Sequence, residues 1–207
     1  AVGFSGVRGY VGPDFTSGFS FNVPTKEAAD QFEGGDLRFD VTILDIVDWA
    51  ADKGAEYTTG FEHTGYFNRK YLPRKRSAEA QGDLNLTNPN NYRAIRFADV
   101  LLMAAEAYNR GGIDDTKAQQ LLNRVRERAF GNTNHAVAYT GAALTDAILQ
   151  ERRVELMGEG HRFFDLVRTK RAAAAITGFV EGKHEVFAIP LEEINFSGGN
   201  WKQNPNY

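Results

Sequence analysis

The feature that most constrains the fold is a series of helical apolar stripes in the second half of the chain. In RFADVLLMAAEAYNRGG the apolar residues recur at helical spacing, and Gly111 and Gly112 end the pattern. A second stripe follows in DDTKAQQLLNRVRERAFG, where Asp114 or Asp115 can cap the start and Gly131 the end. Two helices joined by so few residues predict an antiparallel helical hairpin. The predicted inward positions are Ala98, Leu101, Leu102, Ala105 and Tyr108, then Ala118, Leu121, Leu122, Val125 and Ala129.

Two more helices are predicted after this hairpin. One begins near Gly141 and is broken by GEG at 158–160, and the next begins near His161 and continues through RFFDLVRTKRAAAAI. Small residues such as Ala104 and Ala105 resemble the helix crossings of tetratricopeptide units. The offset between the two helix pairs is about 50 residues rather than about 34, so the relation to that repeat is loose.

The first half of the chain has little periodicity and reads as loops with short elements. We therefore predict a mainly α fold, with tetratricopeptide-like antiparallel helix pairs, an irregular, loop-rich N-terminal part and a few short strands. Residues 1–207 form one domain, with a loop-rich part at 1–91 and a helical scaffold with a C-terminal tail at 92–207. The short elements expected are a helix at 24–32, strands at 39–46, 65–72 and 184–190, a loop at 81–92 and a helical turn at LEEI, 191–194.

Composition excludes several kinds of chemistry. The chain has no Cys, which excludes disulfides, zinc–thiolate sites and thiol nucleophiles. Its net charge of −3 gives no overall attraction to nucleic acid. No apolar run reaches about 18 residues, and no phosphate-binding loop or Rossmann fingerprint is present. We expect no cofactor and no metal. The basic run RKYLPRKR, 69–76, is interpreted as a solvated loop, although its charge would also suit an acidic glycan such as a uronate polymer.

The most highly charged segment is ILQERRVELMGEGHRFFDLVRTKR, 148–171. Glu151, Glu155 and Glu159 recur at i, i+4 and i+8, so they can share one helix face. Paired carboxylates can hydrolyse glycosides when one of them has a raised pKa. Here Arg152 and Arg153 are interleaved and would keep the carboxylates ionised. The spacing therefore favours ion pairs within and between helices.

The rest of this segment also favours a structural joint. Glu159 and His161 are two residues apart, whereas metal ligands on a helix need a spacing of three or four. We expect Phe163, Phe164 and Leu166 to be buried between helices and Arg162, Asp165 and Arg168 to tie helix ends together. The segment is thus interpreted as structural, with catalysis as the weaker alternative.

Six segments, in order, resemble the SusD/RagB family, the surface glycan-binding lipoproteins of Bacteroidetes. They cover about residues 22 to 207, and their order is more specific than any one of them. The segments are NVPTKEAADQFEGGDLRFDVTI, NNYRAIRFADVLLMAAEAYNRGG, LLNRVRERAF, ILQERRVELMGEGHRFFDLVRTKRA, FAIPLEEI and QNPNY. Gly158 and Trp201 depart from the family's usual residues at these places.

The resemblance implies a function. Members of the family bind oligosaccharides or polysaccharides without catalysis at the surface of the outer membrane. They pass them to a TonB-dependent, SusC-like transporter, over which they sit as a lid, and an N-terminal lipid anchors them. Family members are usually much longer and begin with a lipoprotein signal that this sequence lacks, so we expect it to be the C-terminal portion of such a protein.

Candidate glycan contacts lie in the loop-rich part, because binding residues favour loops on a rigid scaffold. Sugar rings stack on aromatic faces, and amide or guanidinium groups bond their hydroxyls. Trp49 is the strongest candidate, since it would project from the end of the predicted strand. Each aromatic residue alone is also compatible with partly buried packing. The candidates are Trp49, Tyr66, Tyr57, Tyr10, Phe61, Asn68 and Arg69, with Phe15 and Asp14 as further ones and Trp201 as a weaker one.

Two alternatives remain at this point. The helical hairpins could form a protein–protein interaction scaffold that contacts the transporter and has no glycan site of its own. A glycosidase is the third and weakest hypothesis.

Overall fold

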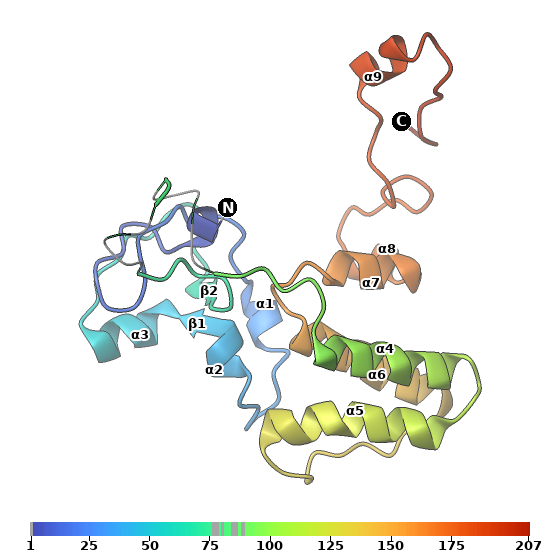
Figure 1. The fold of residues 1–207 in the computed structure, drawn as a ribbon, viewed down its shortest axis with the longest axis horizontal. Coiled ribbons are helices and arrows are strands. Elements are labelled where there is room, and N and C mark those ends of the chain that lie inside the picture. Colours follow the sequence, from blue (N-terminus) through green and yellow to red (C-terminus); the bar gives the residue numbers. More distant parts are fainter. Residues whose placement is uncertain (1, 76–78, 80, 84–86, 88–89) are drawn as a thin grey trace. The chain divides into compact units, whose positions relative to one another are not determined.

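The computed structural model describes residues 2–75, 79, 81–83, 87 and 90–207 (Figure 1). The architecture is mainly helical with an irregular N-terminal part and short strands, so the predicted fold class is confirmed. The elements are a 3₁₀ helix η1 (Val2–Ser5), α1 (Lys26–Ala29), α2 (Phe39–Thr42), β1 (Ile43–Asp45), α3 (Ile46–Lys53), β2 (Tyr66–Asn68), α4 (Phe97–Arg110), α5 (Asp115–Phe130), α6 (Gly141–Glu155), α7 (Arg162–Arg168), α8 (Ala172–Ala175) and α9 (Leu191–Phe196).

The chain divides into two compact units, Ala1–Glu159 and Gly160–Tyr207. The first unit holds the loop-rich part together with α4, α5 and α6. The expected boundary between the loop-rich part (1–91) and the helical scaffold (92–207) therefore lies inside the first unit. The loop expected at 81–92 has no helix or strand at its described positions, and its residues 84–86, 88 and 89 lie outside the described part.

The predicted hairpin of α4 and α5 is confirmed, and α6 packs against both helices (Figure 1). A carboxylate oxygen of Asp114 accepts a hydrogen bond from the Lys117 amide at 2.9 Å, and Gly131 ends α5 with φ of 68°. Buried side chains from all three helices form one core, and most of the predicted inward residues belong to it or pack against it. Its buried members are Leu101, Leu102, Ala105, Ala118, Leu122, Val125, Leu144 and Ile148.

Polar side chains fix the ends of these helices. Asn109, buried at the end of α4, donates a hydrogen bond to Asp115 at 2.7 Å and to the carbonyl of Gly141 at 3.0 Å. Asp115 also accepts from the Gly141 amide at 2.7 Å. The hydrogen bond from Asn109, followed by that from the Gly141 amide, lowers the pKa of Asp115 below its ordinary value. One amide and one carboxylate therefore hold the starts of α5 and α6 at the end of α4.

The loop-rich part has its own small core. β1 and β2 pair antiparallel, with Leu44 opposite Phe67 and Asp45 opposite Tyr66. The core residues come from the N-terminal loops, the two strands, α3 and the segment after β2, and aromatic rings contribute much of the packing. They are Val7, Tyr10, Phe15, Leu44, Ile46, Phe67 and Leu72, with Val23, Trp49, Ala55 and Tyr57 at the margin.

The short elements predicted for this part are mostly shorter than expected. The strand predicted at 39–46 is wrong over 39–42, which is helical, and it ends at Asp45 because that side chain caps α3 by accepting from the Val47 amide at 2.9 Å. The strand predicted at 65–72 is limited to Tyr66–Asn68. The helix predicted at 24–32 spans only Lys26–Ala29, capped by Thr25.

In the second unit, the structure differs from three of the predictions. The single helix expected after His161 is broken, because Lys170 adopts a positive φ of 57° between α7 and α8. Phe163 and Phe164 are exposed, whereas Leu166 is buried as expected. No strand forms at 184–190 in this fully described unit; instead, the Gln203 side chain bonds both the amide and the carbonyl of Ile189 at 2.8 Å. The LEEI segment is helical within α9, as predicted.

Candidate functional site

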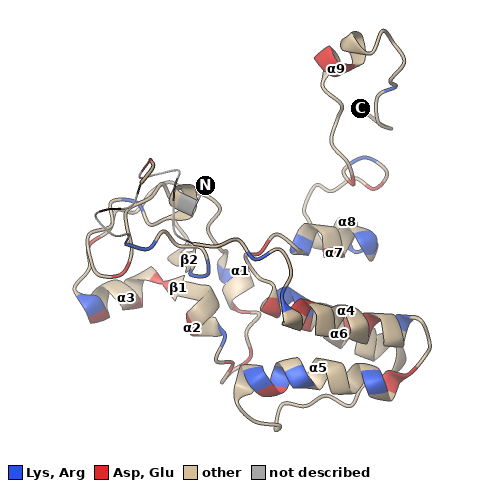
Figure 2. Ribbon diagram, viewed as in Figure 1, with Lys and Arg blue, Asp and Glu red and all other residues tan. Residues whose placement is uncertain are grey.

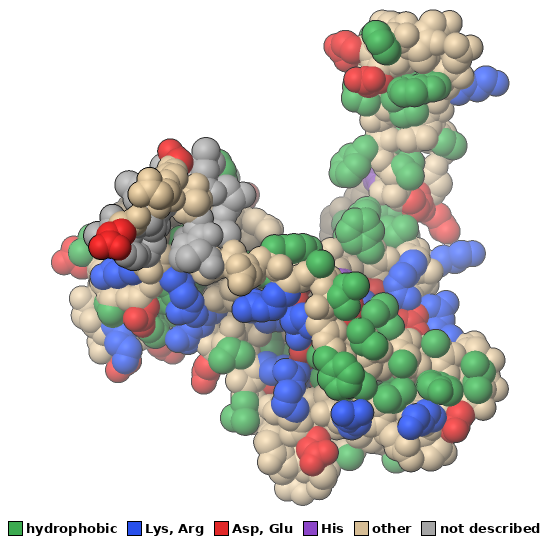
Figure 3. Space-filling view, viewed as in Figure 1, with side chains coloured by type: hydrophobic (Ala, Val, Ile, Leu, Met, Phe, Trp, Pro, Cys, Tyr) green, Lys and Arg blue, Asp and Glu red, His purple; other side chains and the backbone are tan. Residues whose placement is uncertain are grey.

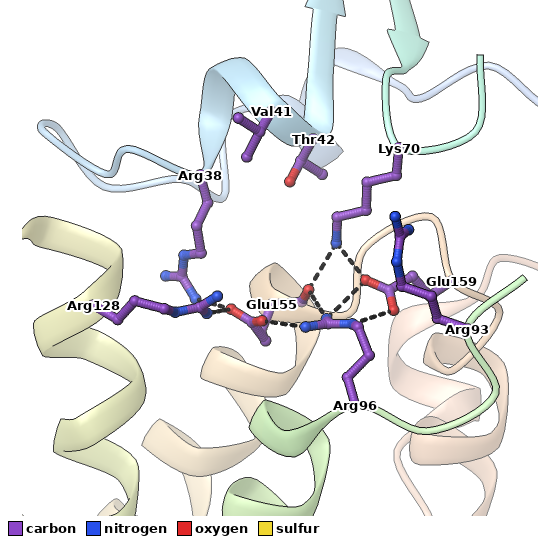
Figure 4. Close-up of a pocket in the computed structure, with 9 residues that line it drawn as sticks. All are labelled: Arg38, Val41, Thr42, Lys70, Arg93, Arg96, Arg128, Glu155 and Glu159. Atoms are coloured by element: carbon purple, nitrogen blue, oxygen red, sulfur yellow. Dashed lines mark hydrogen bonds and ion pairs between the residues drawn. The ribbon is translucent and has the colours of Figure 1, made fainter. Parts of the chain in front are cut away.

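Two of the three glutamates of the charged segment, Glu155 and Glu159, line a pocket of about 230 Å³ (Figure 4), and Glu151 lies one turn before Glu155. Glu151 and Glu155 belong to α6, and Glu159 follows one turn later. All three are buried, with exposed fractions of 2%, 3% and 6%. Buried carboxylates need charged or hydrogen-bonding partners, because desolvation of an isolated charge is costly. Their partners come from segments far away in the sequence: Arg38, Lys70, Arg96, Arg126 and Arg128.

Arg38 connects the loop-rich part with α6. Its Nη1 donates to Glu151 Oε1 at 2.6 Å and to Glu155 Oε2 at 3.0 Å. Its Nε and Nη2 bond the carboxylate of Asp36 at 2.9 Å and 2.6 Å. The other oxygen of Glu151 accepts from Arg126 Nη1 at 2.8 Å. The guanidinium of Arg38 is thus surrounded by three buried carboxylates.

Arg96 and Lys70 complete the pocket. Arg96 donates from Nη1 to Glu155 Oε1 at 2.8 Å and from Nε to Glu159 Oε2 at 2.7 Å. Lys70 Nζ donates to Glu159 Oε1 at 2.6 Å and to the Glu155 carbonyl at 2.8 Å. The segment before α4 and the turn after β2 are therefore both fixed to the end of α6.

The arginines next to Glu151 in the sequence have other partners. Arg152 donates to Asp99 of α4 at 2.7 Å, and Arg153 pairs with Glu27 of α1. The ion pairs of Glu151 and Glu155 described above thus join α6 to other segments of the chain. A single sequence cannot show this, because the cations of the pocket are dozens of residues away.

The protonation state of the pocket argues against acid catalysis. Burial by itself would raise the pKa of Glu155 and Glu159, but hydrogen bonds from Arg96 and the charges of Arg38, Arg128 and Lys70 outweigh it, and both pKa values lie below the ordinary value. A general acid for glycoside hydrolysis needs a raised pKa. Burial lowers the pKa of Lys70 despite its bond to Glu159. The pocket's carboxylates are held ionised, as a structural joint requires.

This pocket makes stability depend on pH. A carboxylate whose folded pKa is depressed stabilises the fold above its unfolded pKa, and that contribution is lost as the pH falls through the folded value. We expect the melting temperature to fall on acidification below the ordinary carboxyl pKa of 4.5. In the variant Glu159→Gln, the melting temperature should fall less steeply with decreasing pH, because one of these carboxylates is absent. Thermal unfolding followed by circular dichroism between neutral pH and about pH 3 would test this. Equal slopes for both proteins would contradict it.

The remaining charged residues of the segment lie in the second unit. Asp165 is buried and accepts from Nε of Arg168 at 2.9 Å, within α7 itself. His161 precedes α7 and is partly buried, and Arg162 is exposed. No group of three or more His, Asp or Glu side chains that could hold a metal ion occurs among the described residues.

Four of the candidate glycan contacts, Trp49, Tyr10, Arg69 and Phe15, lie together in the loop-rich part. The indole Nε1 of Trp49 donates to the Tyr10 hydroxyl at 2.8 Å, and the guanidinium of Arg69 lies 5.0 Å from the Trp49 ring centroid. Phe15 packs against the same indole at 5.4 Å. Tyr10 and Phe15 are buried, so they support Trp49 from the core, while Trp49 itself is partly exposed. Trp49 lies in α3, not at a strand end as predicted.

The other predicted contacts are dispersed around this group. Tyr57 is partly buried beside His63, with ring centroids 5.7 Å apart. Phe61 is 94% exposed. Tyr66 is partly buried in β2, where its amide bonds the Thr64 hydroxyl. Asp14 is exposed, as is Trp201 in the second unit. The structure thus groups Trp49, Tyr10 and Arg69 and leaves Phe61 on the surface.

Asn68 faces away from the aromatic group. Its Nδ2 donates to the carbonyl of Gly158 at 2.9 Å, next to a second pocket of about 160 Å³. Gly158 has a φ of 76°, and a Cβ there would lie 2.3 Å from Asn68 Nδ2. Both the backbone angle and the close approach therefore favour glycine, which accounts for the departure of Gly158 from the family pattern.

One exposed aromatic cluster was not predicted. Phe4, Phe19 and Phe21 lie on the surface with ring centroids 5.6 to 6.5 Å apart. In the sequence, only the alternation of Phe19 and Phe21 indicates that these two rings lie on one side of the chain. Phe4 contacts them because of the way the loop folds.

Comparison with known proteins gives the same family throughout. A family model described as the SusD family matches residues 17–187. SusD-like protein P2 of Formosa agariphila is 29% identical over 80% of this chain and 34% of its own length. SusD-like protein P38 of the same organism is 42% identical over 40% of this chain and 18% of its own length.

Solved structures extend this similarity to the whole chain. A laminarin binding SusD-like protein is 40% identical, with a TM-score of 0.83 over 99% of this chain and 43% of its own. Surface glycan-binding protein A from Bacteroides thetaiotaomicron, in complex with laminarihexaose, is 27% identical, with a TM-score of 0.84 over 100% of this chain and 47% of its own. The chain spans less than half the length of each of these proteins.

Proposed function

Because the chain belongs to the SusD family, we propose that it binds a laminarin-type oligosaccharide without catalysis, at the surface of the outer membrane. The observation that carries this proposal is the 40% identity, at a TM-score of 0.83, with a protein whose name states that it binds laminarin. A second relative, whose structure holds laminarihexaose, supports the same ligand class. The ionised carboxylates of the joint fit a role in binding rather than hydrolysis.

The surface around Trp49 is our proposed glycan contact. A pyranose ring binds by stacking on an aromatic face, with hydrogen bonds from nearby polar groups to its hydroxyls. Trp49 is held in place by Tyr10 and Phe15, and Arg69, whose guanidinium lies over the ring, supplies hydrogen-bond donors. Tyr57, Phe61 and Tyr66 would extend the contact along the same part of the chain. Preorganised aromatic side chains reduce the entropy lost on binding.

Delivery of the glycan to a TonB-dependent, SusC-like transporter is the finer part of the proposal. It rests on family membership and on the exposed face of α4, where apolar side chains gather over the helical part (Figure 3). Exposed apolar patches often mark protein interfaces. The exposed apolar residues of this region are Ile95, Phe97, Val100 and Met103. The same observation favours the second candidate function, an interaction scaffold without its own glycan site.

Binding of laminarihexaose, measured by isothermal titration calorimetry, tests the proposed function. We expect Trp49→Ala to weaken affinity by about five- to thirty-fold, because loss of one stacked ring removes roughly 1–2 kcal/mol. Trp49→Phe keeps a ring but removes the hydrogen bond to Tyr10, and should weaken binding less. Trp201→Ala is the matched control, since Trp201 is an exposed tryptophan of the second unit.

The outcomes separate the two candidate functions. Weakening by Trp49→Ala alone, with an unchanged circular dichroism spectrum, supports a glycan site at Trp49. If the protein binds no laminarihexaose but does bind a SusC-like transporter, the scaffold function replaces the glycan proposal. An equal loss with Trp201→Ala would contradict the proposed place of the site.

A further inference from the structure

A groove in the first unit carries far more positive than negative charge. It consists of the pocket of about 230 Å³ described above and a neighbouring pocket of about 210 Å³, which share Val41, Lys70 and Arg93. We call these two pockets together the basic groove. Figure 3 shows Lys and Arg side chains gathered where the chain leads into α4. The cations that line the groove are Arg38, Arg69, Lys70, Arg74, Arg93, Arg96 and Arg128, and the carboxylates are Glu155 and Glu159.

This charge is local, because the whole chain has a net charge of −3. Figure 2 shows acidic and basic residues on most of the helices, including a basic C-terminal end of α5. Within the groove, the two glutamates are already bonded to Arg38, Lys70, Arg96 and Arg128 on the α6 side. The second pocket is lined by four cations and by the amides of Asn90 and Asn91, with no acidic residue among its described lining.

Of the four cations of the second pocket, Lys70 is paired with Glu159, whereas Arg69, Arg74 and Arg93 form no ion pair within the described residues. Arg69 Nη1 donates to the carbonyl of Asp40 at 2.7 Å, and its guanidinium lies against Trp49. The guanidinium of Arg74 lies 5.5 Å from the ring centroid of Phe15. A carbonyl and aromatic rings orient these groups while their charge remains, and each guanidinium has five N–H donors. Arg74 and Arg93 are both exposed to solvent.

Such an arrangement favours an anion. Like charges in one concave site repel each other, and a groove lined by one sign of charge focuses the field and concentrates counter-ions. Guanidinium groups bond carboxylate and sulfate-like oxygens with two parallel hydrogen bonds. The amides of Asn90 and Asn91 and the indole of Trp49 beside Arg69 add groups of the kind that contact sugar hydroxyls and rings.

We infer that the basic groove binds the anionic group of an acidic oligosaccharide, either a uronate carboxylate or a sulfate ester. The oligosaccharide part of this inference rests on the proposed function; the anionic part rests on the groove alone. The groove extends the proposed contact at Trp49 through Arg69, which faces both. The protein would then accept glycans that carry charge as well as neutral ones.

Calorimetric titration of the protein with four probes tests this inference. The probes are tetragalacturonate for the carboxylate, a sulfated carrageenan tetrasaccharide for the sulfate ester, laminarihexaose as the neutral oligosaccharide, and sodium sulfate as a free anion. We expect one of the two acidic oligosaccharides to bind, with an affinity that falls as NaCl rises from about 50 to about 200 mM. The double variant Arg74→Gln/Arg93→Gln should weaken that binding by about ten-fold or more and leave laminarihexaose binding unchanged.

The control variant is Arg124→Gln. Arg124 is exposed on α5 and lines neither pocket, so it removes one surface charge of the same kind. The inference is overturned if neither acidic oligosaccharide binds, if Arg124→Gln weakens binding as much as the double variant, or if sodium sulfate binds as tightly as the oligosaccharides. If laminarihexaose binds and neither acidic oligosaccharide does, the inferred anion binding of the basic groove is contradicted while the proposed function is retained. Binding of an acidic oligosaccharide without binding of laminarihexaose would support the basic groove and contradict the proposed binding of a laminarin-type oligosaccharide.

Discussion

Replacing Arg38 by Met is expected to reduce the free energy of unfolding by about 3–5 kcal/mol, the usual cost of removing one partner from a buried ion pair. The Arg38 side chain is 10% exposed and bonds three carboxylates that are almost fully buried. Without it, Asp36, Glu151 and Glu155 lose a shared cation. Met fills a similar volume, so the effect reports the charge and its hydrogen bonds rather than a cavity.

Urea denaturation of the variant and of Arg128→Met measures this difference. Arg128 contacts the same oxygen of Glu155, but its side chain is 57% exposed. An exposed pair contributes only about 0–1 kcal/mol, because solvent screens it. The midpoint should therefore shift strongly for Arg38→Met and little for Arg128→Met. Similar midpoints would mean that the carboxylates are stabilised by the other cations or by water, and that Arg38 does not hold the loop-rich part on α6.

Leu102→Ala has the second large expected effect, a loss of about 2–5 kcal/mol. Leu102 is fully buried where α4 packs against α5 and α6, so shortening it removes apolar contacts and leaves a cavity that rigid helices fill only in part. The loss should lower the thermal and urea midpoints together, because one core serves all three helices.

The next residue in the sequence supplies the control. Met103 lies on the outer side of α4 with 45% of its surface exposed, and Met and Ala have similar helix propensities. Met103→Ala should change stability by less than about 0.5 kcal/mol. A large loss for Met103→Ala, or a small one for Leu102→Ala, would contradict the packing of α4 described above.

The helical half was predictable because its signals are local. The apolar stripe from Leu101 to Tyr108, the cap at Asp114 and the glycine at Gly131 each act within one or two turns, and the structure places all of them as expected. The loop-rich part gave no such signals. Its elements are three to eight residues long, and the apolar run at 39–46 is compatible with helix or strand until Asp45 bonds the Val47 amide.

The sequence by itself determined the family, the mainly helical class and the presence of two carboxylates on one face of a helix with a third one turn later. Local periodicity and ordered motifs are properties of the chain alone. Only the tertiary structure decided which cations those carboxylates meet, that Tyr10 and Phe15 support Trp49 from the core, and that Arg69, Arg74 and Arg93 share a groove. Each of these depends on segments distant in sequence, whose approach is set by the packing of two cores rather than by any local pattern.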